Sequence, residues 1–113
     1  MWINPEEYQK YATMDKGEVI AKLVQYKKLV SAHFDIDKVV LFGSYARGNQ
    51  REDSDIDVAI IVNSLDQDFF TYAPLLWKLR REIDHRIEPV LIEKNHDESG
   101  FLSEILQNGL VIN

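Results

Sequence analysis

Residues 58–62 read Val-Ala-Ile-Ile-Val, an unbroken apolar run near the middle of the chain. A strand that is apolar on both faces has to be covered on both sides, so we expect residues 55–62 to form a central strand. Four of the seven residues at positions 52–58 are acidic. The fold must therefore place carboxylates at the beginning of a buried strand.

Helical and strand-like patterns alternate along the rest of the chain. We expect helices over residues 15–33, 44–48, 68–85 and 100–108, and further strands over residues 38–42, 86–92 and 110–112. Asp15 and Ser99 are placed to cap two of these helices, and Pro74 predicts a kink or restart within a third. A short helix over residues 5–13 would form an N-terminal extension, residues 1–14. This alternation predicts an α/β fold with a parallel or mixed sheet.

Length, charge and cysteine content narrow the class of protein. The 113 residues are close to the commonest size of a single domain, so we expect one domain spanning residues 1–113. A net charge of −6 argues against a non-specific nucleic-acid binder. No cysteine, no signal-peptide pattern and no apolar run of about 20 residues is present, so we expect a cytoplasmic protein with no membrane contact.

Gly43 and Ser44 follow one expected strand and open the helix expected at 44–48. Backbone N–H groups and the Ser44 hydroxyl at such a position can bind an anion, and Gly43 lets the backbone approach a ligand closely. Gly-Ser pairs also occur at strand-to-helix turns for reasons of turn geometry alone. Because the segment matches neither the Walker A nor the GxGxxG pattern, both interpretations stay open.

Asp55 and Asp57 are two residues apart on a strand, so their carboxylates point to the same face, about 6.6 Å apart along it. Burying two such charges unpaired costs several kcal/mol or forces protonation. Magnesium removes this cost, because it is typically held by one or two carboxylates together with substrate phosphates. The alternative is a solvated acidic loop that happens to precede a strand.

Glu88 is a third charge inside an apolar run, in the strand expected at 86–92. If that strand lies beside residues 55–62, Glu88 could face the same site as the two aspartates. Pro89 supports the alternative of an exposed edge-strand residue, and Asp84 is a competitor that we expect to be solvated at a helix end. Three carboxylates, a metal pair and a phosphate-binding turn would form a nucleotidyl-transfer site, with Glu88 as general base.

The combined motif is similar to a known signature. Gly43-Ser44, ten residues and then Asp55-Ile56-Asp57, within the longer string GSYARG…SDIDVAI, resembles the DNA polymerase beta-like nucleotidyltransferase superfamily and its minimal subgroup, the MNT domain. The resemblance covers roughly residues 15–112, because the expected elements come in the family's order. It implies a nucleotidyltransferase fold, with a small mixed sheet flanked by helices.

The resemblance also implies a reaction, the Mg²⁺-dependent transfer of a nucleoside monophosphate from a nucleoside triphosphate to an acceptor. Asp55 and Asp57 would hold both metal ions. Glu88 stands where the family has its third carboxylate, a position that is more often Asp.

The same resemblance assigns the triphosphate to the Gly-Ser turn. Gly43 and Ser44 would hold it, and Arg47, one helical turn later, could contact the phosphates. The alternative for Arg47 is a solvated arginine on the helix surface.

Stand-alone MNT domains of this size resemble the antitoxin of HEPN/MNT toxin–antitoxin pairs. In that family AMP is transferred from ATP to a tyrosine of the HEPN ribonuclease toxin, so we expect a hetero-oligomer with a dimeric toxin and no direct contact with nucleic acid. Two alternatives remain. The protein could neutralise its partner by contact alone, or it could be a nucleotidyltransferase with a small-molecule or RNA acceptor.

Overall fold

The computed structural model describes residues 15–48, 54–65, 69–95 and 99–113. The elements in chain order are α2 (Lys16–Ser31), β1 (Ile36–Phe42), α3 (Ser44–Arg47), β2 (Ile56–Val62), α4 (Phe69–Leu79), the 3₁₀ helix η1 (Arg80–Glu82), β3 (Ile87–Glu93), α5 (Phe101–Asn108) and β4 (Leu110–Ile112). The helix expected over residues 5–13, and with it the N-terminal extension 1–14, lies outside the described residues.

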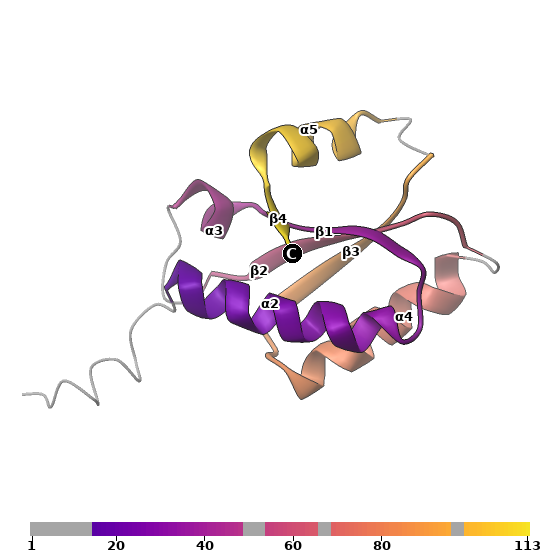
Figure 1. The fold of residues 1–113 in the computed structure, drawn as a ribbon, viewed down its shortest axis with the longest axis horizontal. Coiled ribbons are helices and arrows are strands. Elements are labelled where there is room, and N and C mark those ends of the chain that lie inside the picture. The colour runs from indigo at the N-terminus through magenta and orange to yellow at the C-terminus, as the bar shows by residue number, and fades with distance from the viewer. Residues whose placement is uncertain (1–14, 49–53, 66–68, 96–98) are drawn as a thin grey trace, which may run out of the picture.

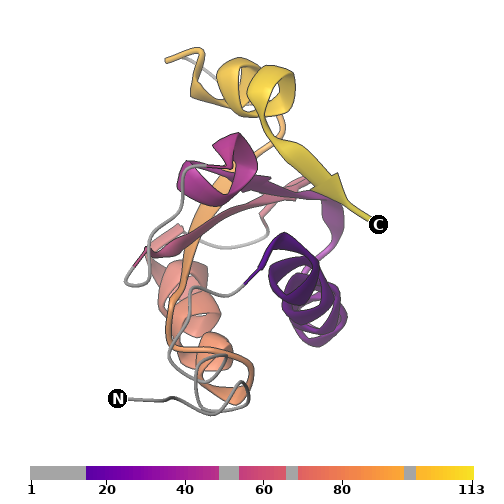
Figure 2. The ribbon, with the colours of Figure 1, turned by 90° about the vertical axis from the view of Figure 1, so that its left-hand side faces the viewer.

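The four strands form one mixed sheet in the order β3-β2-β1-β4. β1 runs antiparallel to β2 and to β4, whereas β2 and β3 are parallel. Helices α2 and α4 cover one face of the sheet, and α5 covers the other (Figures 1 and 2). The predicted α/β fold is confirmed, and β2 is an inner strand covered on both sides, as its apolar run predicts.

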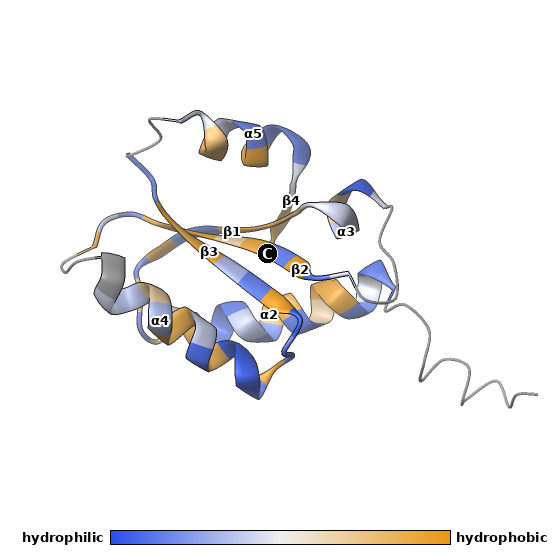
Figure 3. Cartoon of the chain, turned by 180° about the vertical axis from the view of Figure 1, so that it is seen from behind, coloured by the Kyte–Doolittle hydropathy of each residue, from blue (hydrophilic) through white to orange (hydrophobic). Residues whose placement is uncertain are grey.

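Alternation along β2 divides the core into two layers. Ile56, Val58, Ile60 and Val62 face α2 and α4, whereas Ala59 and Ile61 pack with Leu102 and Ile105 of α5. The strands are largely hydrophobic between helices that carry hydrophilic segments (Figure 3). Because Asp57 is in phase with Ala59 and Ile61, its carboxylate lies on the face that α5 covers.

Helix α2 begins and packs as its sequence predicts. The Asp15 side chain accepts a hydrogen bond of 2.8 Å from the backbone N–H of Glu18, which satisfies an N–H group of the first turn. The predicted apolar stripe is fully buried, and its members are Val19, Leu23, Tyr26 and Val30. The Tyr26 hydroxyl also donates to the backbone oxygen of Leu76 at 2.7 Å, which ties α2 to α4.

Two helix predictions are wrong in detail. The helix expected over residues 68–85 ends at Leu79 and is followed by a 3₁₀ turn, and α4 continues through Pro74 without a restart. Proline removes one helical hydrogen bond, and burial of Leu76 two residues later holds the helix on the sheet. Ser99 is not the N-cap of α5, because Gly100 holds that position, but Ser99 Oγ still accepts from the first helical N–H, that of Phe101, at 3.3 Å.

The end of α5 is fixed by close packing at Gly109, which is the predicted terminus. A Cβ at Gly109 would lie 2.6 Å from the backbone oxygen of Ile105 and 2.6 Å from Val40 Cγ1. Only glycine allows the chain to pass from α5 directly into β4 at this distance from β1. None of the helices in the described ranges has both the length and the apolar character needed to cross a membrane.

Candidate active site

The sheet register brings the predicted site residues together. Asp57 on β2 is paired with Phe42 on β1 and with Glu88 on β3. Residues directly opposite each other on neighbouring strands point to the same face, so the Glu88 and Asp57 carboxylates lie side by side on the α5 face. β3 is an edge strand, as the alternative interpretation of Glu88 required from Pro89, but Glu88 is half-buried there and not exposed.

Gly43 follows Phe42 and lies directly against Asp57. Its φ of 74° and ψ of −149° fall in a region that is essentially restricted to glycine. A Cβ built at Gly43 would lie 2.2 Å from Asp57 Oδ2, a distance that no side chain could accept. The Gly-Ser turn therefore lies directly against the carboxylate of the next strand.

Helix α3 holds this turn in place. Arg47 N–H donates to the Gly43 oxygen at 3.1 Å, and the fully buried Tyr45 anchors α3 in the core beneath it. Ser44 stays half-buried, and Arg47 is exposed. Burial and the charge of Asp55 raise the pKa of Asp57, and the positive charge of Arg47 offsets part of this rise, so the guanidinium acts electrostatically on the same carboxylate.

The three predicted carboxylates interact with one another. Burial raises the pKa of Asp57, and the charge of Asp55 raises it further. Burial also raises the pKa of Glu88, with further contributions from the charge of Asp55, a side-chain hydrogen bond with Asp55 and the charge of Asp57. Asp55 itself is exposed and lies just before the first residue of β2. Repulsion within this cluster therefore disfavours the state in which all three are charged.

These carboxylates fit a divalent cation that is completed by a substrate. In residues 15–48, 54–65, 69–95 and 99–113, no three His, Cys, Asp or Glu side chains form a ready-made metal-binding group. Mg²⁺ rarely uses an all-protein cage, and binds instead through one or two carboxylates, waters and substrate phosphates. Burial and then mutual repulsion raise the pKa values of Asp57 and Glu88, and a cation would offset the repulsion. Hard carboxylate oxygens are the ligands that Mg²⁺ prefers.

A pocket of about 480 Å³ adjoins the carboxylates on the α5 face. Gly43, Arg47 and Asp57 line it, and α5 forms its opposite wall, with Phe101 and Asn108 among the lining residues. The contribution of α5 to this pocket could not be predicted from the sequence. Its amphipathic pattern indicates a helix that packs on the sheet, but no local motif connects residues 101–108 with the Gly-Ser turn more than fifty positions earlier.

Asp84 is the residue that competes with Glu88 as the third carboxylate. The prediction that it is solvated is wrong. Its carboxylate lies 2.8 Å from Lys22 Nζ and 3.1 Å from Arg86 Nη2, and its side chain is only 9% exposed. Burial would raise the pKa of Asp84, but hydrogen bonds from Arg86 and Lys22 outweigh it and hold the pKa well below its usual range. Asp84 thus ties α2 to Arg86, the residue just before β3, in which Glu88 is the second residue.

We expect Asp84→Asn to lower the free energy of unfolding by about 1–3 kcal/mol at pH 7, because it removes charged hydrogen bonds from a nearly buried group. A carboxyl whose pKa is depressed by folding stabilises above its unfolded pKa of about 3.9 and loses this effect as pH falls. The difference from wild type should therefore shrink below about pH 4 in urea titrations. A pH-independent difference would contradict this account.

Asp37→Asn is the matched control for that experiment. Asp37 is also paired with two lysines, Lys38 at 3.2 Å and Lys94 at 3.4 Å, but these lysines are 43% and 50% exposed. Exposed ion pairs are worth less than about 1 kcal/mol. Its loss of stability should be clearly smaller than that of Asp84→Asn.

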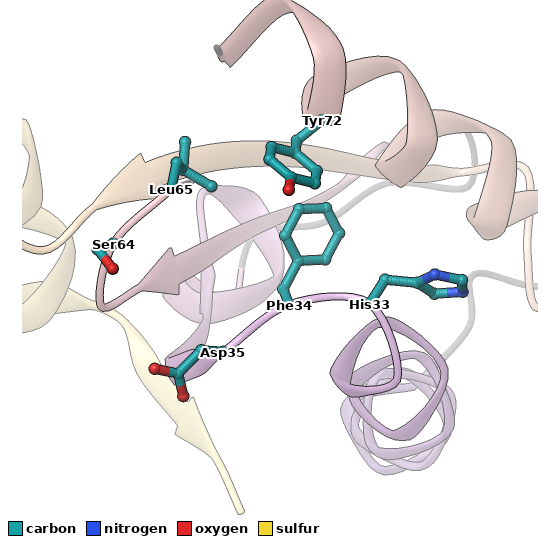
Figure 4. Close-up of a pocket in the computed structure, with 6 residues that line it drawn as sticks. All are labelled: His33, Phe34, Asp35, Ser64, Leu65 and Tyr72. Carbon is teal, nitrogen blue, oxygen red and sulfur yellow. The ribbon is translucent and has the colours of Figure 1, made fainter. Parts of the chain in front are cut away.

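A second pocket, of about 190 Å³, lies at the opposite end of β1 and β2. Phe34 and Tyr72 face each other across it in an edge-on contact, with ring centroids 5.1 Å apart (Figure 4). The other labelled side chains do not converge on one point, and Asp35 and His33 point outward in different directions (Figure 4). This pocket therefore lacks the gathered carboxylates that mark the first site.

A small mixed sheet that sets a Gly-Ser turn against paired strand carboxylates defines a nucleotidyltransferase. Comparison with known families agrees: residues 24–113 match the model of "Polymerase beta, Nucleotidyltransferase", and the chain belongs to this family. The family resemblance in the sequence and the predicted nucleotidyltransferase fold are both confirmed.

Two relatives and one solved structure show which proteins of known name this chain resembles. A protein of Methanocaldococcus jannaschii named "Putative protein adenylyltransferase" is 30% identical over 99 residues, which cover 84% of this chain and 99% of the relative. "Protein adenylyltransferase MntA" of Thermococcus cleftensis is 37% identical over 49 residues, 43% of this chain and 50% of the relative. A solved structure described as a toxin-antitoxin with AMP-PNP has a TM-score of 0.62 at 21% identity, with 83% of this chain and 72% of that chain covered.

Proposed function

We propose that this enzyme transfers AMP from ATP, in the presence of Mg²⁺, to a tyrosine of a HEPN ribonuclease toxin, and acts as the antitoxin of that toxin. The contact between Gly43 and Asp57 carries the proposal, because a turn that could bind phosphate lies directly against a carboxylate that could bind the metal. The names of the relatives support the protein acceptor, and the toxin-antitoxin description of the structural neighbour supports the partner.

Two groups of residues would hold the substrate. Gly43 and Ser44 would bind the triphosphate through backbone N–H groups and the Ser44 hydroxyl, and Arg47 would pair with a phosphate oxygen. Asp55 and Asp57 would hold Mg²⁺, with Glu88 as the third carboxylate. The bound Mg²⁺ would neutralise charge on the phosphates as it develops during transfer.

Glu88 would also act as the general base. The acceptor hydroxyl forms a bond to the α-phosphorus, its proton passes to the Glu88 carboxylate, and the bond to the leaving pyrophosphate breaks. A base acts best when its pKa lies near the working pH, and burial, the largest cause of the raised pKa of Glu88, moves it in that direction. The three carboxylates then share binding and proton transfer along one edge of the β2–β3 pair.

The proposal also covers the assembly with the toxin and the cellular location of the enzyme. The antitoxin would form a hetero-oligomer with a dimeric toxin in the cytoplasm, where ATP is available. The net charge of −6 argues against direct contact with nucleic acid, so the RNA acceptor is the less favoured alternative.

Labelled ATP distinguishes the proposal from its alternatives. Purified protein is incubated with Mg²⁺ and its toxin partner, once with ATP labelled at the α-phosphate and once with ATP labelled at the γ-phosphate. The proposal predicts that the toxin takes α-label and no γ-label. α-Label on RNA or on a small molecule would move the acceptor elsewhere, and neutralisation of a bound toxin without any label would favour a binding module.

A further inference from the structure

The pocket between α3 and α5 has the size of a small-molecule site. Its volume of about 480 Å³ is within the range typical of small-molecule sites, roughly 300–1,000 Å³. Gly43, Arg47 and Asp57 line one side, so a ligand in the pocket would be continuous with any phosphate held at the Gly-Ser turn. The residues on the α5 side have no part in the chemistry proposed above.

The α5 side of the pocket has the chemistry of a base-binding surface. Phe101 is 39% exposed although it is large and apolar, and its ring meets Phe42 edge-on with centroids 5.8 Å apart. Both rings line the pocket. Asn108 lines it too. One N–H of its amide donates to the Glu104 backbone oxygen at 3.3 Å, which leaves the second N–H and the amide oxygen as the donor and acceptor that recognise the edge of a purine base.

Charge determines which end of a nucleotide can lie here. Arg47 is on the α3 side of the pocket, whereas Glu104 and the carbonyl end of α5 give the other side a negative character. A triphosphate is therefore favoured beside α3 and disfavoured beside α5. A neutral base meets no such penalty.

The sheet order separates this pocket from the route of the acceptor. β2 carries Asp57, β3 with Glu88 lies on one side of it, and β1 with Phe42 lies on the other. Glu88 is not among the described residues that line the pocket. An acceptor hydroxyl that gives its proton to Glu88 would approach from the β3 side, which leaves the pocket on the β1 side to the nucleotide.

We propose that the pocket between α3 and α5 is the nucleoside subsite of the enzyme, in which Phe101 and Phe42 contact the purine base and Asn108 binds its edge. This inference rests on the proposed function, because it takes ATP as the substrate. It adds to that function the residues that make the enzyme prefer a whole nucleotide over a bare triphosphate.

Binding of two ligands tests the subsite without any transfer reaction. Calorimetric titration with Mg²⁺ and α,β-methylene-ATP is compared with titration by Mg²⁺ and tripolyphosphate, which has no base. Phe101→Ala should weaken binding of the ATP analogue about tenfold, as expected for the loss of one base–aromatic contact, and Asn108→Ala about fivefold. Tripolyphosphate should bind both variants within about twofold of wild type, since its site at α3 is intact.

Leu106→Ala is the matched control. Leu106 lies on the same helix and is 42% exposed, close to the value of Phe101, but it does not line the pocket. This variant should bind both ligands as wild type does. Unchanged affinity of Phe101→Ala for the ATP analogue would overturn the subsite, and equal weakening of both ligands would overturn it as well.

The same titrations separate the subsite from the proposed function. Loss of α-label transfer in Phe101→Ala with unchanged nucleotide affinity would assign the pocket to the acceptor and reject the subsite. Base-dependent binding in a wild-type enzyme that labels no partner would uphold the subsite and reject the protein acceptor.

Discussion

Gly43→Ala is expected to lower nucleotidyl transfer by at least about 100-fold while the protein remains folded. The new methyl group would start 2.2 Å from Asp57 Oδ2, so either the turn or the carboxylate has to move by an ångström or more. Displacement on this scale at a reacting centre costs about two orders of magnitude in rate. The readout is α-label transfer at saturating ATP, with thermal unfolding of the same sample to confirm that the variant is folded.

Gly48→Ala is the matched control for this substitution. Gly48 also has a positive φ, 79°, but a Cβ there would meet nothing within 4 Å. Both alanines impose backbone strain, on the order of 1–3 kcal/mol, and both should lower the melting temperature. Only Gly43→Ala should lose transfer. Equal transfer by the two variants would show that the contact between Gly43 and Asp57 has no part in the reaction.

Asp57→Asn is expected to abolish transfer, by about 1,000-fold or more, and to make the metal-free protein more stable at neutral pH. The amide has nearly the shape of the carboxylate but cannot supply a charged ligand to Mg²⁺. Burial and the neighbouring charge of Asp55 disfavour the ionised Asp57 in the folded state, and the amide removes that penalty. Opposite changes in activity and stability are the signature of a residue kept for function.

The pH dependence of stability gives an independent readout of Asp57. Folding raises its pKa, so the folded state binds more protons than the unfolded state as pH rises from the unfolded pKa of about 3.9 to the folded value. Wild type should lose stability across this interval. Asp57→Asn should lose less, because only Glu88 then contributes a raised pKa, and the charge of Asp57 no longer adds to it. Melting temperatures in the presence of chelator from pH 3 to pH 8 measure it, and identical pH profiles would contradict the assigned environment.

Asp35→Asn controls for the chemical change itself. Asp35 is exposed and precedes β1, at the end of the sheet opposite Asp57. Transfer by this variant should equal that of wild type. A deficit as large as that of Asp57→Asn would mean that the loss comes from a change in net charge and not from the position of the carboxylate.

The sequence predicts which residues form helices and strands better than it predicts which of these elements lie side by side. Periodicity identifies the buried stripe of α2, and the apolar run at 58–62 identifies an inner strand, because both signals are local. The pairing of Asp57 with Glu88 was predicted only on the condition that their strands are neighbours. The strand order of the sheet meets that condition.

Other features depend on contacts between distant segments and have no local signal. A carboxyl at a helix end usually meets water, so nothing near Asp84 indicates its pairing with Lys22, 62 positions away. The end of the long helix at Leu79 is equally hidden, since the residues after it also fit a helical pattern. The clash at Gly43 and the α5 wall of the pocket likewise need the complete tertiary structure.

The mass of the partner protein tests the central claim most directly. The toxin is incubated with ATP, Mg²⁺ and either wild-type enzyme or Asp57→Asn, and its intact mass is then measured, followed by fragmentation to locate any modified residue. The account predicts that wild type adds the mass of one or more AMP groups to a tyrosine and that Asp57→Asn adds nothing. An unmodified toxin after incubation with folded, toxin-bound wild-type enzyme would contradict it.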